Sequence, residues 1–250
     1  MTTATTAAHT AAHTGPAAPP RRSDPTRKVA LAGGIAYLVT FAASVPQLKL
    51  FAGIVDDPAG YIGTVRDNTA VLWGSSLEVV TAAACVATAV ALYPVTRRVS
   101  RTAAIGFVTS RVMEAALILV GVLSLLSVVT LQDHFAGATG AQADALGVTG
   151  EALVALRQWT FLLGPGLIPG INALLLGYVM YRGRLVPRLI PTVGLIGAPI
   201  ILVSAVATIF GGWEQTSVAG GLCALPIAVW EFSLGLWLTV KGFTRRPAAD

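Results

Sequence analysis

The chain has 250 residues, of which 54% are hydrophobic and only 12% are charged. Soluble domains carry about 25% charged residues, so this composition excludes an ordinary soluble protein and favours membrane spans. The formal net charge of +5 does not predict a nucleic-acid partner, because the basic residues fall in short clusters between apolar runs.

Residues 1–26 are rich in Ala, Thr and Pro and show no hydrophobic periodicity, so we expect a disordered N-terminal tail. They do not resemble a signal peptide, because no basic start precedes a short apolar core with a cleavage site. Residues 27–243 are predicted to form a transmembrane domain, and residues 244–250 a cytoplasmic tail.

Six apolar segments follow the tail, and each is long enough, at about 1.5 Å per residue, to cross roughly 30 Å of hydrocarbon. The fold class is therefore predicted to be all-α, a polytopic membrane helical bundle. The six predicted transmembrane helices are residues 29–48, 71–93, 103–128, 158–181, 189–210 and 219–241.

The Lys and Arg residues at the ends of these spans and in the loops alternate between the two sides of the membrane. One side has thirteen, namely Arg21, Arg22, Arg27, Lys28, Arg97, Arg98, Arg101, Arg182, Arg184, Arg188, Lys241, Arg245 and Arg246. The other side has three, namely Lys49, Arg66 and Arg157, among seven acidic residues. By the positive-inside rule, both termini are predicted to lie in the cytoplasm.

The connection before the fourth span and the middle of that span are unusual. Residues 132–150 are rich in Ala and Gly, so we expect a mobile loop on the outer side. Residues 164–170, GPGLIPG, contain two prolines and three glycines, which predicts a kinked or split helix. A plain kink is the favoured interpretation, although interrupted spans also line binding sites in transporters.

Five polar residues lie inside the predicted spans, and four of them are ionisable: Glu78, Arg111, Glu114, Asn172 and Glu231. A charged group at the centre of a membrane helix costs about 2.5–3.5 kcal/mol. Four such groups facing lipid would cost on the order of 10 kcal/mol, which is comparable to the stability of a whole protein. We therefore expect all five to face the interior of the bundle.

Their depths follow from the rise of a helix. Glu114, Asn172 and Glu231 are expected near the midplane, with Arg111 one turn closer to the cytoplasm. A cluster of Arg111, Glu114 and Glu231 is predicted, whereas Glu78 lies about one-third of the way in from the outer side and is expected to meet water there.

Charge balance gives this cluster two interpretations. One arginine against three glutamates leaves an excess of two negative charges. Protonated carboxyls, a cation or water must balance this excess, which is the chemistry of a proton relay or a cation-coupled site. The cluster is either such a site or a structural lock between helices, and for Asn172 alone interhelical hydrogen bonding is the favoured interpretation.

No metal site and no cofactor are predicted. Cys85 and Cys223 both lie inside apolar runs and are expected to be small packing residues rather than a disulfide. His9, His13 and His134 all lie outside the spans, whereas the ligands of a haem or a His-bound metal would have to lie within the bundle.

Several short patterns together resemble one bacterial family. Arg111 and Glu114 in the third span are followed by Asn172 with LGYVMYR and then VPR, and Glu231 is followed by LWLTVKG. With these patterns the chain resembles the domain-of-unknown-function family 4386, which consists of six-span bacterial membrane proteins, over residues 27–243. The resemblance implies a membrane location and a six-span fold, and it implies no activity.

Two functions are consistent with this reading. The first is a small proton- or cation-coupled transporter in which Glu114 and Glu231 carry the ion and Arg111 either modulates them or anchors an anion. The second is a non-transporting membrane scaffold or regulatory protein whose polar cluster is structural. An enzyme and catalytic residues are not predicted, because no Gly-x-Ser-x-Gly elbow or His-Glu-x-x-His pair occurs.

The expected partners are the lipid bilayer and an unidentified small-molecule or ion ligand. Arginine outnumbers lysine and alanine is abundant, which is typical of a GC-rich bacterial genome. We therefore predict a multi-pass protein of the bacterial plasma membrane.

Overall fold

The computed structural model describes residues 25–63, 67–135 and 137–244. The predicted N-terminal tail, apart from its last two residues, lies outside this range, as does all but the first residue of the predicted C-terminal tail. In the described part of the chain the regular structure is helical, without a strand, which confirms the predicted all-α class.

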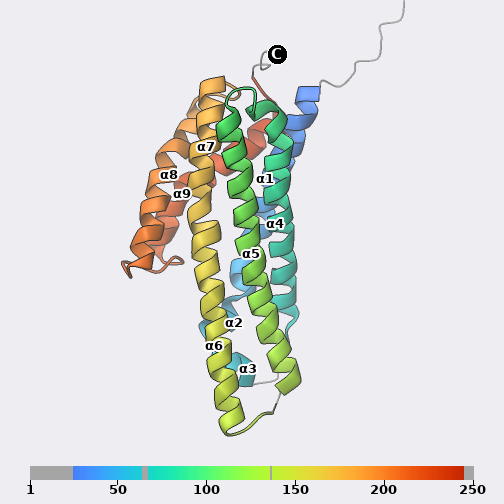
Figure 1. The fold of residues 1–250 in the computed structure, drawn as a ribbon, viewed down its shortest axis with the longest axis vertical. Helices are drawn as coiled ribbons and strands as arrows, with labels where there is room; N and C mark the ends of the chain where they lie inside the picture. Colours follow the sequence, from blue (N-terminus) through green and yellow to red (C-terminus); the bar gives the residue numbers. More distant parts are fainter. Residues whose placement is uncertain (1–24, 64–66, 136, 245–250) are drawn as a thin grey trace, which may run out of the picture.

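The helices are named in chain order (Figure 1). Their bounds are α1 Pro25–Leu50, α2 Ala52–Asp56, α3 Pro58–Gly63, α4 Thr69–Thr96, α5 Arg101–Phe135, α6 Ala141–Phe161, the π-helical turn η1 Leu162–Leu167, α7 Ile168–Gly183, α8 Leu189–Ile209 and α9 Val218–Val240.

Among the described residues, six helical stretches are long and apolar enough to cross a membrane, which confirms the predicted polytopic bundle. They are Thr26–Leu50, Thr69–Thr96, Arg101–Phe135, Ala141–Gly183, Leu189–Ile209 and Val218–Val240. Each contains one predicted span to within a residue or two, so the apolar runs were sufficient to locate all six.

The expected mobile loop at residues 132–150 is wrong. Helix α5 continues to Phe135 and α6 begins at Ala141, so most of that stretch is helical. The Ala- and Gly-rich composition concealed Leu146, which packs with Leu153 and Val154 of the same helix into an apolar cluster with residues of α3 and α5. Packing of this spaced apolar face, rather than overall composition, decides the local structure.

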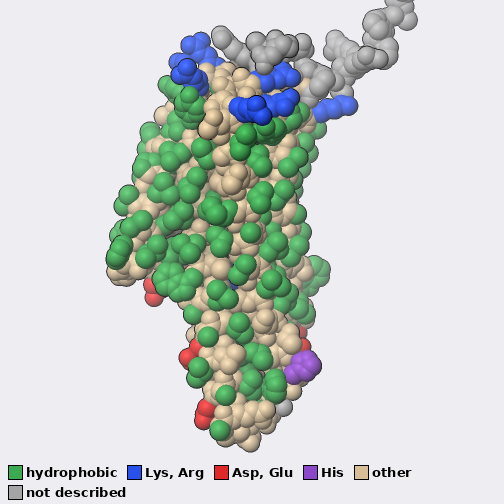
Figure 2. Space-filling view, in the orientation of Figure 1, with side chains coloured by type: hydrophobic (Ala, Val, Ile, Leu, Met, Phe, Trp, Pro, Cys, Tyr) green, Lys and Arg blue, Asp and Glu red, His purple; other side chains and the backbone are tan. Residues whose placement is uncertain are grey.

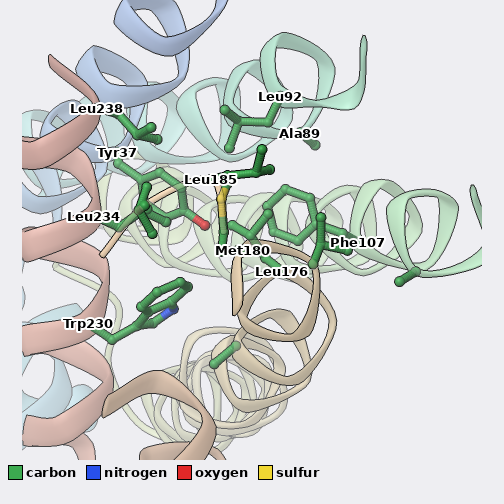
Figure 3. Packing of buried hydrophobic residues seen from close by; sticks show 14 of the residues in the cluster. Tyr37, Ala89, Leu92, Phe107, Leu176, Met180, Leu185, Trp230, Leu234 and Leu238 are labelled. Carbon is green, nitrogen blue, oxygen red and sulfur yellow. The ribbon is translucent and has the colours of Figure 1, made fainter. Parts of the chain in front are cut away.

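The six spans close into a ring. Helix α1 packs on α4, α4 on α5, α5 on α7, α7 on α8, α8 on α9, and α9 back on α1. The main hydrophobic core lies inside this ring toward the end where the chain begins and finishes, and Figure 3 shows Tyr37, Met180 and Trp230 within it. Leu185, from the connection between α7 and α8, is buried in the same core and fills that end of the bundle.

The helices differ in length, and α5 and α6 extend beyond α8 and α9 to form a projection from the bundle. Helix α5 has 35 residues and is about 52 Å long, whereas α8 has 21 residues and is about 31 Å long. Helices α8 and α9, with 21 and 23 residues, match the thickness of a bilayer, whereas α5 and α6 continue beyond them (Figure 1). The projection has its own apolar cluster, which includes Phe51, Ile62 and Leu125.

Charged residues separate to the two ends of the bundle (Figure 2). The end that carries Lys28, Arg97, Arg98, Arg101, Arg182, Arg184, Arg188 and Lys241 is called the basic end, and the described chain both begins and finishes there. The opposite end, called the acidic end, carries Asp56, Asp57, Asp67, Asp133, Asp144, Glu151 and Glu214. This alternation is the one that the sequence predicts, and the side of the membrane that each end faces stays a prediction.

At the acidic end, Asp67 lies two residues before the first residue of α4. Its Oδ1 accepts hydrogen bonds from the backbone N–H of Thr69 at 2.9 Å and from the Thr69 hydroxyl at 2.6 Å. These bonds favour the ionised form and hold the pKa of the Asp67 carboxyl below its usual range. The helix therefore starts with an anion at the positive end of its dipole.

At the basic end, Arg27 joins the first span to the last. Its guanidinium donates to the carbonyl oxygens of Leu238 at 3.0 Å, Thr239 at 2.7 Å and Val240 at 3.3 Å, all in the last turn of α9. Those carbonyls have no partner within their own helix, and a cation at a helix C-terminus also interacts favourably with the dipole.

Replacing Arg27 with glutamine is therefore expected to lower the free energy of unfolding by about 1–2 kcal/mol. The measurement is reversible unfolding in mixed detergent micelles. Lys28→Gln is the matched control, because Lys28 is the next residue and is exposed. Equal stabilities for the two variants would contradict the role of Arg27 as a clamp.

Candidate functional site

The structure brings four of the five predicted polar residues into contact: Arg111, Glu114, Asn172 and Glu231, called here the Arg111 group. Arg111 Nη1 donates to Glu114 Oε2 at 3.0 Å, one turn along α5. Its Nη2 donates to Glu231 Oε1 on α9 at 2.7 Å. One guanidinium is thus shared between two carboxylates that belong to different helices.

Asn172 connects this ion-pair network to α7. Its Nδ2 donates to Glu114 Oε2 at 2.7 Å, the same oxygen that Arg111 contacts. The hydroxyl of Ser110 in turn donates to Asn172 Oδ1. Glu114 therefore accepts from two donors, and helices α5, α7 and α9 meet through polar contacts.

Two further helices complete the surroundings of Arg111. The ring of Tyr37 from α1 lies 4.8 Å from Arg111 Cζ, in a cation–π contact, and Cys85 Sγ from α4 lies 3.6 Å from Arg111 Nη1. The sequence analysis did not predict these two contacts, because a tyrosine and a cysteine in apolar runs look like packing residues. The Tyr37 hydroxyl and Arg111 Nε are buried and have no hydrogen-bond partner among the described residues.

The members of the Arg111 group differ in exposure. The side chain of Arg111 is 2% exposed and that of Glu114 is 6% exposed, whereas that of Glu231 is 14% exposed. Glu231 is therefore the most accessible of the three charged side chains. With every group ionised, the network carries one positive and two negative charges in a buried position, where unpaired charge is costly.

The interrupted part of the fourth span lies beside this network. The chain does not split there, because α6 continues through the π-helical turn η1 into α7. Pro165 has no N–H to donate to the carbonyl oxygen of Phe161, and Gln215 Nε2 donates to that oxygen instead at 3.3 Å. A Cβ at Gly164 would lie 3.0 Å from the side chain of Leu117, so this turn packs closely on α5 next to Glu114.

Glu78 does not join the Arg111 group, and its expected contact with water near the outer mouth is wrong. It is 1% exposed, and its Oε1 accepts a hydrogen bond from Arg157 Nη2 at 2.5 Å. The sequence analysis placed Arg157 in an outer loop, whereas the structure places it in α6 with its side chain 7% exposed. Because Arg157 was expected in a loop, it was not recognised as the partner of Glu78.

This second contact, called the Arg157–Glu78 pair, also corrects the charge balance. Two arginines, rather than one, face three glutamates in the buried part of the bundle, so the formal excess is one negative charge and it belongs to the Arg111 group. A signal for Arg157 was present in the sequence. The residues just before it, Leu153, Val154 and Leu156, are apolar and extend the fourth span to its N-terminal side.

The described residues contain no group of three or more His, Cys, Asp or Glu side chains that could hold a metal ion. Cys85 is buried and Cys223 is partly buried, and both are free thiols.

A family model described as Domain of unknown function (DUF4386) matches residues 32–242. The match runs from α1 past the end of α9 and includes both the Arg111 group and the Arg157–Glu78 pair. It confirms the resemblance found in the sequence. The chain matches no curated protein and no solved structure.

Proposed function

The chain belongs to this family of multi-pass membrane proteins, and we propose that it is a small proton- or cation-coupled transporter whose coupling site is the Arg111 group. The plasma membrane of a bacterium is the proposed location. The basic end is proposed to face the cytoplasm, because Lys and Arg gather there and the acidic residues lie at the opposite end (Figure 2).

The observation that carries the proposal is the sharing of Arg111 between Glu114 and Glu231. One cation cannot neutralise two buried carboxylates, so the site requires one more positive charge. A proton or a small cation supplies that charge, and its arrival and departure change the attraction between α5 and α9. Ionisable groups inside a membrane protein commonly mark ion and proton pathways.

The π-helical turn supports the same proposal. Turns of this type are rare and occur frequently at functional sites, and broken helices line the ion sites of many transporters. Here the turn packs on α5 beside Glu114, and Asn172 follows it within α7. A local change in this turn would therefore move a direct partner of Glu114.

The alternative function is a non-transporting scaffold or regulatory protein in which the Arg111 group is a structural lock. One observation favours it. Glu114 accepts from Arg111 and Asn172, and Asn172 accepts from Ser110, so this part of the network is extensively hydrogen-bonded, as in a fixed contact between helices.

Proton uptake into proteoliposomes distinguishes the two functions. Glu114→Gln and Glu231→Gln each remove one negative charge while keeping the side-chain shape, so a coupled transporter is expected to fall to the flux of protein-free liposomes. The measurement is an enclosed pH-sensitive dye under an imposed membrane potential. Glu151→Gln is the control, because Glu151 is exposed on α6 at the acidic end and should leave the flux unchanged.

A structural lock gives the opposite pattern. Both glutamine variants would then give the same proton flux as the wild type, and their thermal unfolding in detergent would shift to lower temperature instead. Wild-type flux in both variants removes the transport proposal.

A further inference from the structure

The Arg157–Glu78 pair lies between the Arg111 group and the acidic end, along the same interface of α4 and α5. On α4, Glu78 is seven residues nearer the acidic end than Cys85, which contacts Arg111, and this spacing is about 10 Å along the helix. On α5, Gly121 contacts the Arg157 side chain and is about 15 Å from Arg111 by the same rise. The two charged sites therefore form successive levels.

An apolar layer separates these levels. Ala82 from α4 and Ala115 and Ile118 from α5 form a buried cluster with Cys85. The side chains of Ala82, Ala115 and Ile118 offer no hydrogen bond, so this layer disfavours the passage of an ion or a water molecule between the two levels.

The Arg157–Glu78 pair also blocks the path by its own packing. The rings of Phe51 and Phe161 lie 5.4 Å and 4.9 Å from Arg157 Cζ. A Cβ at Gly121 would lie 3.0 Å from Arg157 Cδ, so this glycine provides the recess that the arginine occupies. The pair joins α4 to α6 and is covered on the acidic side by the apolar cluster of the projection.

The pair, like the Arg111 group, contains buried polar atoms that have no hydrogen-bond partner among the described residues. Glu78 Oε2, Arg157 Nε and the hydroxyl of Ser75, one turn from Glu78 on α4, are all buried without a hydrogen-bond partner among the described residues. In a form that is opened to the acidic end, water would be able to hydrogen-bond with all three.

From these observations we infer that the Arg157–Glu78 pair is a gate, which opens to connect the acidic end with the Arg111 group and closes to separate them. The inference rests on the proposed transport function and assigns two further residues to it. Arg157 and Glu78 control access to the site, and Arg111 with its two glutamates binds the ion.

Cys85 provides a native reporter for this gate, because it contacts Arg111 and is 1% exposed. The experiment uses the full chain with Cys223→Ser, so that Cys85 is the single thiol. A membrane-impermeant cationic methanethiosulfonate is added to one face of sealed membrane vesicles, in right-side-out and inverted preparations, and the rate of Cys85 modification is measured.

We expect Glu78→Gln to raise the rate about tenfold or more from the acidic-end face alone, because the opening equilibrium sets the reactivity of a buried group. Arg157→Lys keeps a cation near Glu78 but loses the planar guanidinium, and it should give a smaller increase from the same face. Glu151→Gln, on the same helix as Arg157, should leave the rate unchanged.

An unchanged rate in both gate variants overturns the inference. If Glu78→Gln reacts equally from both faces it has lost its fold, and Arg157→Lys then decides in the same way. The rate of Cys85 modification is measured without a transport assay, so the gate and the proposed function are tested separately. If Cys85 shows gated reactivity but the protein carries no proton flux, proton coupling is removed and the gate is kept. If the protein carries coupled flux but the rate of Cys85 modification is unchanged in the gate variants, the gate is removed and the transport function is kept.

Discussion

Replacing Arg111 with methionine is expected to lower the free energy of unfolding by about 3–5 kcal/mol, because Glu114 and Glu231 then remain buried without their cation. Methionine has a similar length and no charge, so the effect reports on electrostatics more than on packing. The measurement is equilibrium unfolding in mixed micelles. Arg98→Met, at the exposed basic end, is the control and should change stability by no more than about 0.5 kcal/mol.

A second variant separates charge from shape in this experiment. Combining Arg111→Met with Glu114→Gln and Glu231→Gln removes all three charges, and replacing a whole buried ionic group is often nearly neutral. The triple variant should therefore recover much of the lost stability. A triple variant less stable than Arg111→Met alone would show that the two carboxylates do not depend on Arg111.

Replacing Gly34 with alanine should lower the free energy of unfolding by about 1–3 kcal/mol, through overpacking between α1 and α9. A Cβ at Gly34 would lie 2.7 Å from the backbone nitrogen of Thr239 and 2.8 Å from the carbonyl oxygen of Gly235. Backbone atoms cannot move aside as a flexible side chain does, so the two helices must separate.

The control for Gly34 lies in α9 itself. A Cβ at Gly221 would meet no atom within 4 Å, so Gly221→Ala should be neutral or stabilising by up to about 1 kcal/mol, the usual gain from Gly to Ala in a helix. Both variants are measured by unfolding in mixed micelles. Equal stabilities would contradict the close approach of α1 and α9.

The six spans could be predicted from the sequence because a membrane helix requires a continuous apolar run, and such runs are visible without any tertiary information. The start of α6 could not be predicted in the same way. Its Ala- and Gly-rich residues become helical because Leu146, Leu153 and Val154 pack against α3 and α5, and that packing depends on the arrangement of distant segments.

Part of the candidate site could be predicted from the sequence, because an ionisable side chain that faces lipid is costly. Arg111, Glu114, Asn172 and Glu231 were expected to face inward, and the depth of each residue indicated that they could meet. Arg157 was missed because an arginine at the edge of an apolar run fits the count of loop charges equally well. The roles of Tyr37 and Cys85 have no sequence signal, because they follow from which helices adjoin α5.

The unequal lengths of the helices have a consequence for the Arg111–Glu231 contact. Glu231 is carried by α9, whose length suits the hydrocarbon thickness, while Arg111 is carried by α5, which overshoots it. We expect a thicker or thinner bilayer to change the tilt of α9 more than that of α5, because α5 extends beyond the hydrocarbon. The distance between the Arg111 guanidinium and the Glu231 carboxylate is therefore expected to depend on the acyl-chain length of the surrounding lipids.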